Sequence, residues 1–240
     1  MKRILVTGGL GFIGSAFLRR FVVERPNIAW LNVDAMTYCA DPRRIDGIDK
    51  LPCYGARFVD ISRWEDVARL VSWAPDTIVH FAAETHVDRS ILDPEVFTRT
   101  NVVGTLNMPM VIERCLTRQP ITIHGDGKNL RDWLHVEDHV SGIWTILERG
   151  KLGESHNIGG TEEVSNEDVV NEVCACVADT LDAHVDDFLA LKTYVTDRPG
   201  NDRRYALDTT KLRALGWAPR RRFDEGVAEV VERAVRRWNR

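Results

Sequence analysis

A glycine-rich loop near the start of the chain constrains the fold more than any other feature of the sequence. The segment TGGLGFIG occupies Thr7–Gly14, directly after the β-branched run Ile4–Thr7 and at the start of an apolar-periodic helix predicted for Ile13–Val23. Glycines between a strand and a helix permit a tight turn and let the backbone approach a pyrophosphate. The N–H groups of Phe12 and Ile13 would then point at the phosphates from the N-terminus of a helix. The segment therefore predicts a dinucleotide-binding Rossmann unit.

An acidic residue at the end of the next predicted strand indicates which dinucleotide this loop suits. The strand Trp30–Asp34 places Asp34 twenty residues after Gly14. A carboxylate there accepts hydrogen bonds from the adenosine ribose hydroxyls and repels a 2′-phosphate, which favours NAD over NADP. The alternative, glycines that serve only a structural turn, is disfavoured by the strand–turn–helix context and by this carboxylate.

Strands and helices alternate over the first hundred residues, which is typical of a parallel sheet with right-handed crossovers. We expect a truncated, doubly wound Rossmann sheet of about four leading strands in residues 1–107 and a small α+β part in residues 108–240. The further elements predicted for the first part are strands at Arg57–Asp60 and Thr77–Ala82 and helices at Trp64–Trp73 and Pro94–Asn107. Those predicted for the second part are strands at Ile121–His124, Ser155–Ile158 and Thr193–Thr196, helices at Val111–Arg118, Val136–Leu147, Thr209–Leu215 and Asp224–Trp238, and a helix that is capped at Ser165–Asp168 and ends near Leu181.

Composition argues against several other classes of protein. The formal net charge of −4 leaves no bulk electrostatic footprint for nucleic acid. The five cysteines are an odd number without a Cys-x-x-Cys pair, so we expect a reducing compartment and neither a disulfide framework nor a zinc site. The first apolar run stops at Thr7, too early for a signal peptide, and no later segment approaches a membrane span. We therefore expect a cytoplasmic protein with no nucleic-acid or membrane partner.

Two histidines lie four residues apart on a predicted helix, at His135 and His139. Such a pair can hold a metal on one helix face, but the segment lacks the His-Glu-x-x-His frame of the known zinc motif. We expect both side chains to face solvent and expect no metal.

The sequence resembles a known family over nearly its whole length. The segments TGGLGFIGS, FAAETHVDRSI and TNVVGTLN are similar to the extended short-chain dehydrogenase/reductase superfamily. The segments GDGKNLRDWLHVEDH, HNIGG, RPGNDRRYALD and LGWAP narrow the resemblance to the dTDP-glucose 4,6-dehydratase family. All these segments occur in the family's order, with one interruption. The combination of RDW-x-x-VEDH with a later RPG-x-DRRYA-x-D is highly specific for this family.

The resemblance implies an NAD-dependent lyase of deoxysugar biosynthesis, a homodimer in this family. Its reaction converts dTDP-glucose to dTDP-4-keto-6-deoxyglucose: a hydride moves from the sugar to nicotinamide, water is eliminated, and the hydride returns to another carbon. The cofactor-binding residues predicted from the glycine loop and the matching family positions are Gly8, Gly11, Phe12, Ile13, Gly14, Asp34, Thr37, Asp60, Ile61, Ala82, Ala83 and Thr100. The residues that match positions around the sugar and the nucleotide diphosphate are Thr85, Arg131, Asn166, Arg198 and Asn201. Asn201 stands where the family usually has histidine, so it keeps a donor but does not titrate near neutrality.

The catalytic motifs of that family are missing from this chain. The superfamily uses a tyrosine followed four residues later by a lysine, whose charge lowers the tyrosine pKa from the same helix face. The four tyrosines here are followed at that spacing by Pro42, Phe58, Arg198 and Thr209. The family's Thr-Asp-Glu segment, whose carboxyl groups serve the elimination, is absent too. The interruption follows Asn107, where TNVVGTLN runs straight into MPMVIERC. We assign no catalytic residue.

This interruption has physical consequences and leaves three hypotheses open. Without the later strands, the edge of the fourth strand is exposed or covered by rearranged segments, and we expect adenosine binding to survive better than nicotinamide placement. We expect the dimer contacts that the family makes through the missing section to be lost or weakened. The first hypothesis is a 4,6-dehydratase by descent whose activity is impaired or absent in this shortened chain. The second is a non-catalytic protein that keeps the NAD or dTDP-sugar sites, and the third is an epimerase or dehydrogenase acting on another nucleotide sugar.

Overall fold

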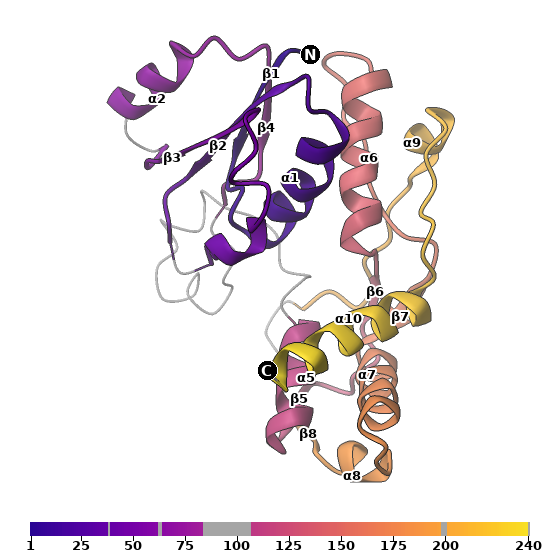
Figure 1. Ribbon diagram of the computed structural model, residues 1–240. Coiled ribbons are helices and arrows are strands. Elements are labelled where there is room, and N and C mark those ends of the chain that lie inside the picture. Colours follow the sequence, from indigo (N-terminus) through magenta and orange to yellow (C-terminus); the bar gives the residue numbers. More distant parts are fainter. Residues whose placement is uncertain (38, 62–63, 84–106, 198–200, 240) are drawn as a thin grey trace. The chain divides into compact units, whose positions relative to one another are not determined.

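The chain divides into two compact units, Met1–Val103 and Gly104–Arg240 (Figure 1). The computed structural model describes residues 1–37, 39–61, 64–83, 107–197 and 201–239. The helix predicted for Pro94–Asn107 lies outside the described residues except for its last residue.

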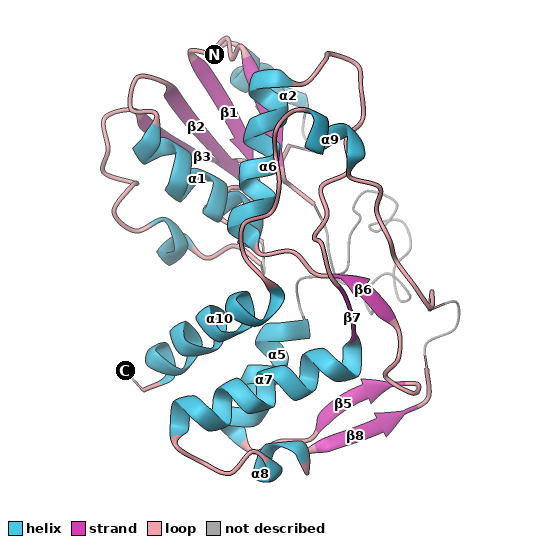
Figure 2. Ribbon diagram, turned by 90° about the vertical axis from the view of Figure 1, so that its right-hand side faces the viewer, coloured by secondary structure: helices cyan, strands magenta, loops and turns pink. Residues whose placement is uncertain are grey.

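The first unit is built on a parallel sheet whose strand order is β3-β2-β1-β4. Its described elements are β1 (Arg3–Thr7), α1 (Phe12–Glu24), β2 (Ala29–Asp34), the 3-10 helix η1 (Pro42–Ile45), β3 (Tyr54–Phe58), α2 (Trp64–Val71) and β4 (Thr77–His80). β1 pairs with both β2 and β4, in registers that set Thr7 opposite Val33 and His80. All four strands run in the same direction, so their carboxyl ends meet at one edge of the sheet (Figure 2). The predicted four-stranded Rossmann sheet is confirmed.

Apolar side chains on both faces of this sheet explain why helices cover both sides. On one face, the ring of Phe17 in α1 packs against that of Phe21, with centroids 4.9 Å apart, and meets Trp30 of β2 edge-on. On the other face, Leu70 of α2 joins a buried cluster with three strand residues, Leu5, Leu31 and Val33. A parallel sheet buried on both faces requires such near-continuous apolar strands.

The second unit combines a helical core with two small sheets (Figure 2). Its described elements are α5 (Asn107–Thr117), β5 (Ile121–His124), β6 (Leu130–Asp132), α6 (Val136–Arg149), β7 (Glu163–Ser165), α7 (Asn166–Leu181), α8 (Asp186–Leu189), β8 (Lys192–Val195), α9 (Thr210–Ala214) and α10 (Phe223–Trp238). β5 pairs in parallel with β8, and β6 pairs antiparallel with β7. The α+β character expected for this part is confirmed.

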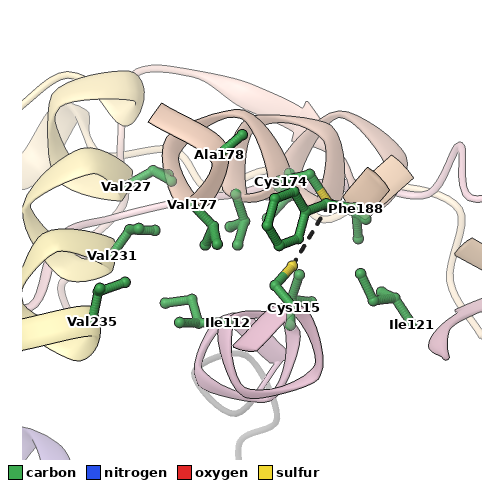
Figure 3. Close-up of a cluster of buried hydrophobic side chains, with 14 of the residues drawn as sticks. Ile112, Cys115, Ile121, Cys174, Val177, Ala178, Phe188, Val227, Val231 and Val235 are labelled. Atoms are coloured by element: carbon green, nitrogen blue, oxygen red, sulfur yellow. Dashed lines mark hydrogen bonds between the residues drawn. The ribbon is translucent and has the colours of Figure 1, made fainter. Parts of the chain in front are cut away.

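The core of the second unit lies between α5, α7 and α10 (Figure 3). Val227, Val231 and Val235 repeat every four residues along α10, so that they form one apolar stripe. This stripe meets apolar side chains of α5 and α7, and Phe188 of α8 closes the cluster. Full burial of side chains of this size stabilises the fold by about 1.5–3 kcal/mol each.

Side-chain caps fix where α6 and α7 begin. The Ser165 hydroxyl accepts a hydrogen bond from the Asp168 N–H at 3.1 Å, which confirms the cap predicted for α7. At the start of α6, Nδ1 of His135 accepts from the Glu137 N–H at 3.2 Å. The expectation that His135 and His139 face solvent is wrong, because both side chains are partly buried and burial lowers the pKa of each.

The sequence places most elements within two or three residues of their observed bounds, and one predicted strand is wrong. Ser155–Ile158 forms a loop, in which the side chain of Ile158 packs closely against Gly142 of α6. Its apolar side chain therefore reflects packing on a helix and not strand pairing. The sequence predicts neither β6 nor β7, because three residues are too few to show a two-residue period. Among the described residues, no helix has the length and apolar character needed to cross a membrane.

Candidate functional site

The loops that follow the four parallel strands meet at the carboxyl edge of the first unit's sheet. The register of β2 and β3 sets Asp34 opposite Phe58, and the Val59 N–H donates to the Asp34 carbonyl at 3.1 Å. On the other side of β1, the Phe81 N–H donates to the Thr7 carbonyl at 3.0 Å. Ligands of open α/β sheets bind at this edge.

In the glycine loop between β1 and α1, side chains at Gly8 and Gly14 would collide with the backbone. A Cβ on Gly14 would lie 2.3 Å from the Gly8 carbonyl oxygen, and one on Gly8 would lie 2.6 Å from the backbone nitrogen of Ala82. Gly8 also has a φ of +68°, in the left-handed region that favours glycine. The Gly11 N–H donates to the Gly8 carbonyl at 3.1 Å and closes the turn that leads into the helix.

The first turn of α1 is suited to an anion. Its N-cap residue is Gly11, so no side chain caps the helix, and this described turn contains no acidic residue. The N–H groups of Phe12 and Ile13 have no partner within the helix, because the first N–H groups of any α-helix lack one. Together with the helix dipole, these donors fit a phosphate group. The residues present therefore fit the pyrophosphate of a dinucleotide.

The carboxylate of Asp34 connects the glycine loop to β2. Its side chain is largely buried, with Oδ2 accepting from the Leu10 N–H and Oδ1 accepting from the Met36 N–H, both at 2.9 Å. These two bonds fix the plane of the carboxylate while each oxygen retains acceptor capacity. A ribose diol would donate to such a group, and a 2′-phosphate would be repelled by it.

The other predicted cofactor residues in the described range lie in loops at the same edge: Thr37, Asp60, Ile61, Ala82 and Ala83. The Ala82 N–H donates to the Thr7 hydroxyl oxygen at 3.2 Å, so a small residue lies directly beside the end of β1. Thr100 and the predicted substrate residue Thr85 lie outside the described residues. The roles of all these residues stay predictions.

A second group of predicted residues converges around β6 in the second unit. The Leu130 N–H donates to the Arg203 carbonyl at 2.9 Å, and the Tyr205 N–H donates to the Leu130 carbonyl at 3.2 Å. The backbone N–H of Asn166 donates to the Asn129 carbonyl at 3.1 Å. β6 therefore brings together the start of α7 and the segment that follows residue 201.

Three contacts hold the side chain of Arg131 on β6. Nη1 donates to the Leu130 carbonyl at 2.7 Å, Nη2 donates to Oδ1 of Asn201 at 3.0 Å, and the guanidinium carbon lies 4.4 Å from the centroid of the Tyr205 ring. An arginine fork suits the oxygens of a phosphate. Arg198, the other predicted arginine ligand, lies outside the described residues.

Asp132 anchors β6 to the glycine pair of the HNIGG segment. The Gly160 N–H donates to Oδ1 at 2.7 Å, and a Cβ on Gly159 would lie 2.3 Å from Oδ2. Burial raises the pKa of this carboxyl group. Asp132 therefore fixes the strand that carries Arg131, a role that the sequence interpretation did not assign.

None of the described tyrosines has the properties of a catalytic base. Burial raises the pKa of Tyr54, hydrogen bonding to Glu167 raises that of Tyr194, and hydrogen bonding to Asp202 raises that of Tyr205. A catalytic tyrosine needs a neighbouring cation that lowers its pKa. Arg131 acts in this direction on Tyr205, but the hydrogen bond to Asp202 outweighs it. Tyr38 lies outside the described residues.

The structure adds Gly9 to the residues that shape the glycine loop. A Cβ at Gly9 would lie 2.1 Å from Oδ1 of Asn32, a buried amide that donates to the hydroxyl of Tyr54 at 2.9 Å. The signal in the sequence is the Gly8-Gly9 pair, in which the first glycine serves the turn and the second serves packing against β2.

Two family models match different parts of the chain. The model for the NAD-dependent epimerase/dehydratase family matches residues 4–115, and the model for GDP-mannose 4,6 dehydratase matches residues 108–230. The two matches meet at residues 108–115, next to the interruption predicted after Asn107.

Relatives of known name match both ends of the chain. A probable dTDP-glucose 4,6-dehydratase of Sinorhizobium fredii (strain NBRC 101917 / NGR234) is 32% identical over 326 residues, covering 96% of this chain and 92% of the relative. The dTDP-glucose 4,6-dehydratase 1 of Escherichia coli (strain K12) is 30% identical over 336 residues, covering 96% of this chain and 92% of the relative. Because this chain has only 240 residues, at least 86 positions of the first alignment face a gap in it.

Solved structures give the same result. A crystal structure of DesIV, a dTDP-glucose 4,6-dehydratase from Streptomyces venezuelae with NAD bound, superposes with a TM-score of 0.84 at 27% identity, covering 98% of this chain and 97% of that one. The dTDP-glucose 4,6-dehydratase of Bacillus anthracis in complex with NAD superposes with a TM-score of 0.79 at 26% identity, covering 99% of this chain and 97% of that one. The chain belongs to the dTDP-glucose 4,6-dehydratase family of NAD-dependent lyases.

Proposed function

We propose that this chain binds NAD through its first unit and a dTDP-sugar through its second, and that its own residues do not complete the dehydratase reaction. One observation carries the proposal: Asp34 and Arg131, predicted for the two sites, are each held by hydrogen bonds, whereas the paired tyrosine and lysine of the superfamily are absent from the sequence. This is the second of the hypotheses raised by the sequence, held within the dehydratase family.

The NAD site rests on three features at the carboxyl edge of the sheet. The glycine loop admits the pyrophosphate, the first turn of α1 donates N–H groups to it, and Asp34 accepts from the ribose. NAD, when bound, supplies a site that accepts a hydride from the sugar and returns it. The part of this chain is to orient the cofactor and to exclude NADP.

The nucleotide-sugar site rests on the residues around β6. Arg131 presents a guanidinium whose orientation is fixed by Asn201 and Tyr205, and Asn166 begins α7 beside the same strand. The relatives that match this chain are named for their action on dTDP-glucose, a dTDP-sugar. A diphosphate binds such an arginine through charge-assisted hydrogen bonds.

Turnover requires proton transfers that this chain is not equipped to make. General acid and base groups typically contribute about 10²–10⁴-fold each to the rate, and both the tyrosine base and the paired carboxyl groups are missing. We expect a folded, NAD-loaded sample to form no detectable 4-keto product from dTDP-glucose. Product at a rate above that of the chemical background would overturn this part of the proposal.

Thermal unfolding is the experiment that tests binding. A ligand at a hundredfold excess over its dissociation constant stabilises the fold by about 2.7 kcal/mol. We expect the melting temperature of the purified chain to rise with NAD and again with dTDP. A cooperative transition that neither ligand shifts would reject both sites, and a preference for UDP-sugars over dTDP-sugars would revive the third hypothesis.

Assembly and location are further expectations. We infer that the family's homodimer is weakened here, because the missing section is expected to carry part of the interface. Light scattering after size-exclusion chromatography should give the mass of a monomer or a concentration-dependent mixture, and a tight dimer would contradict this. A cytoplasmic location stays a prediction.

A further inference from the structure

Asn201 forms a bridge between a carboxylate and the guanidinium of the proposed diphosphate site. Its Nδ2 donates to Oδ1 of Asp197 at 2.8 Å, and its Oδ1 accepts from Nη2 of Arg131 at 3.0 Å. Asp197 lies two positions after the end of β8, and Arg131 lies on β6. The bridge therefore links the end of β8 to β6. An amide can make both bonds at once because it carries a donor and an acceptor.

The two ends of this bridge are themselves fixed. Oδ2 of Asp197 lies 2.9 Å from an ideal Cβ on Gly125, a residue with φ of +65°, so the carboxylate fills the space that a side chain there would need. Arg131 is stacked on the Tyr205 ring and bonded to its own strand through the Leu130 carbonyl. Asn201 therefore connects two anchored groups.

The bonds within the described residues use two of the five guanidinium N–H donors of Arg131. No other residue that the structure describes takes up the remaining donors, which leaves them for an anion in an orientation that Asn201 and Tyr205 set. The resemblance predicts Asn201 as a ligand-binding residue; we propose that it is instead a positioning residue, which aims the fork of Arg131 at the diphosphate of the nucleotide sugar and does not itself bind the ligand. This inference rests on the proposed dTDP-sugar site.

The chemistry at position 201 supports a bridging role over direct contact with phosphate. An aspartate there would repel Asp197 and neutralise Arg131, and an alanine would release both groups. The neutral amide satisfies Asp197 without taking away the charge of Arg131. The full positive charge of the guanidinium is thereby kept for the ligand.

A double-mutant cycle tests this inference. The affinity for dTDP and for thymidine is measured by calorimetry in the wild type, Asn201→Ala, Arg131→Ala and the double variant. We expect Asn201→Ala to weaken dTDP about tenfold, because Arg131 loses its hydrogen bond to Asn201 and with it part of its fixed orientation, and to leave thymidine unchanged. In the Arg131→Ala background, the additional loss from Asn201→Ala should vanish.

Asn171 offers a matched control. Its Oδ1 also accepts from a cation, Nζ of Lys192, at 3.0 Å, so Asn171→Ala removes a similar bond away from Arg131. We expect this variant to bind dTDP like the wild type. Asn201→Asp should weaken dTDP at least as much as Asn201→Ala, because it adds a negative charge beside the site.

The outcomes separate this inference from the proposed function. If the wild type binds dTDP but the losses of Asn201→Ala and Arg131→Ala add, or if thymidine weakens in parallel, the positioning role is wrong and the binding site stands. If the wild type binds no dTDP while its unfolding stays cooperative, the proposed function is wrong and the positioning role is rejected with it.

Discussion

The Sγ atoms of Cys115 on α5 and Cys174 on α7 lie 3.8 Å apart in the core of the second unit (Figure 3). Both side chains are fully buried, and the hydrogen bond between them together with burial raises the pKa of the Cys115 thiol. A thiol that is buried and protonated is inert toward oxidants and thiol reagents. The pair therefore contributes to packing between α5 and α7.

The first prediction concerns the reactivity of these thiols. Cys39, Cys53 and Cys176 are only half-buried, so in the native protein we expect them to react with a chromogenic aromatic disulfide before Cys115 and Cys174 do. The last two should react only at the rate at which the core opens, and all five should react at once in denaturant. Rapid reaction of five thiols in the native state would contradict this packing.

The second prediction concerns Asp138, a fully buried carboxylate on α6. Its Oδ2 accepts from the N–H groups of Arg220 and Arg221, at 3.0 and 2.9 Å, and so ties the segment before α10 to α6. We expect Asp138→Ala to lower the free energy of unfolding by about 3 kcal/mol, because it leaves two N–H donors unpaired. Asp138→Asn should cost less, since its amide oxygen still accepts.

The free energies of unfolding of the Asp138 variants are measured by denaturant titration. An exposed aspartate that also lies in the first turn of a helix provides the control. Asp186 lies in the first turn of α8 and is exposed. Asp186→Ala should change the free energy of unfolding by no more than about 0.5 kcal/mol. If Asp138→Ala and Asp186→Ala lower the free energy of unfolding equally, the hydrogen bonds of Asp138 to the segment before α10 do not stabilise the fold as predicted.

The third prediction concerns the pH dependence of stability at His135. Burial, and next the charge of Arg221, lower the pKa of this imidazole below its usual value, against the opposing effect of Glu229. The folded state therefore favours the neutral ring. The stabilisation is fully present above the unfolded pKa of about 6.5 and is lost as the pH falls through the folded pKa.

Asn is among the best N-cap residues, so His135→Asn keeps the acceptor for the Glu137 N–H and removes the titrating ring. We expect this variant to lose less stability than the wild type as the pH falls from 7 to 5, with a slope smaller by up to about 1.4 kcal/mol per pH unit. Parallel pH profiles of the two proteins would contradict the role of His135.

The fourth prediction concerns the glycine loop. Gly14→Ala sets a methyl group against the Gly8 carbonyl, a backbone atom that cannot move without opening the loop. We expect this variant to lose the rise in melting temperature that NAD produces. Gly55→Ala in β3 is the control, because its Cβ meets nothing closer than 3.8 Å and should be neutral or stabilising by about 0.5 kcal/mol.

The sheet and its site were predictable because the residues that build them are contiguous. The loop Thr7–Gly14 and the strand ending at Asp34 carry both the fold and the chemistry in short segments. The second site was harder to predict, because Arg131, Asn166 and Asn201 are joined by strands of three residues and by loops. Resemblance to a family identified these residues, whereas periodicity did not.

The roles of Asp132, Asp197 and Tyr205 could not be predicted for a further reason. Asp132 acts on Gly160 and Tyr205 acts on Arg131, partners that are distant in the sequence. Asp197 acts on Asn201, only four residues further along the chain, but no regular element joins the two. The same physics explains the error at His135, whose burial depends on contacts with α10 that no local pattern records. Tertiary contacts override local signals at these positions.

Asp34 has two tasks in one side chain, since the carboxylate proposed to choose between dinucleotides also receives the N–H groups of Leu10 and Met36. An exchange made to admit a 2′-phosphate would remove the acceptor that holds the glycine loop against β2. Cofactor preference and loop geometry are thus linked in this protein. A change of preference would have to be accompanied by a second substitution that restores an acceptor for those two backbone donors.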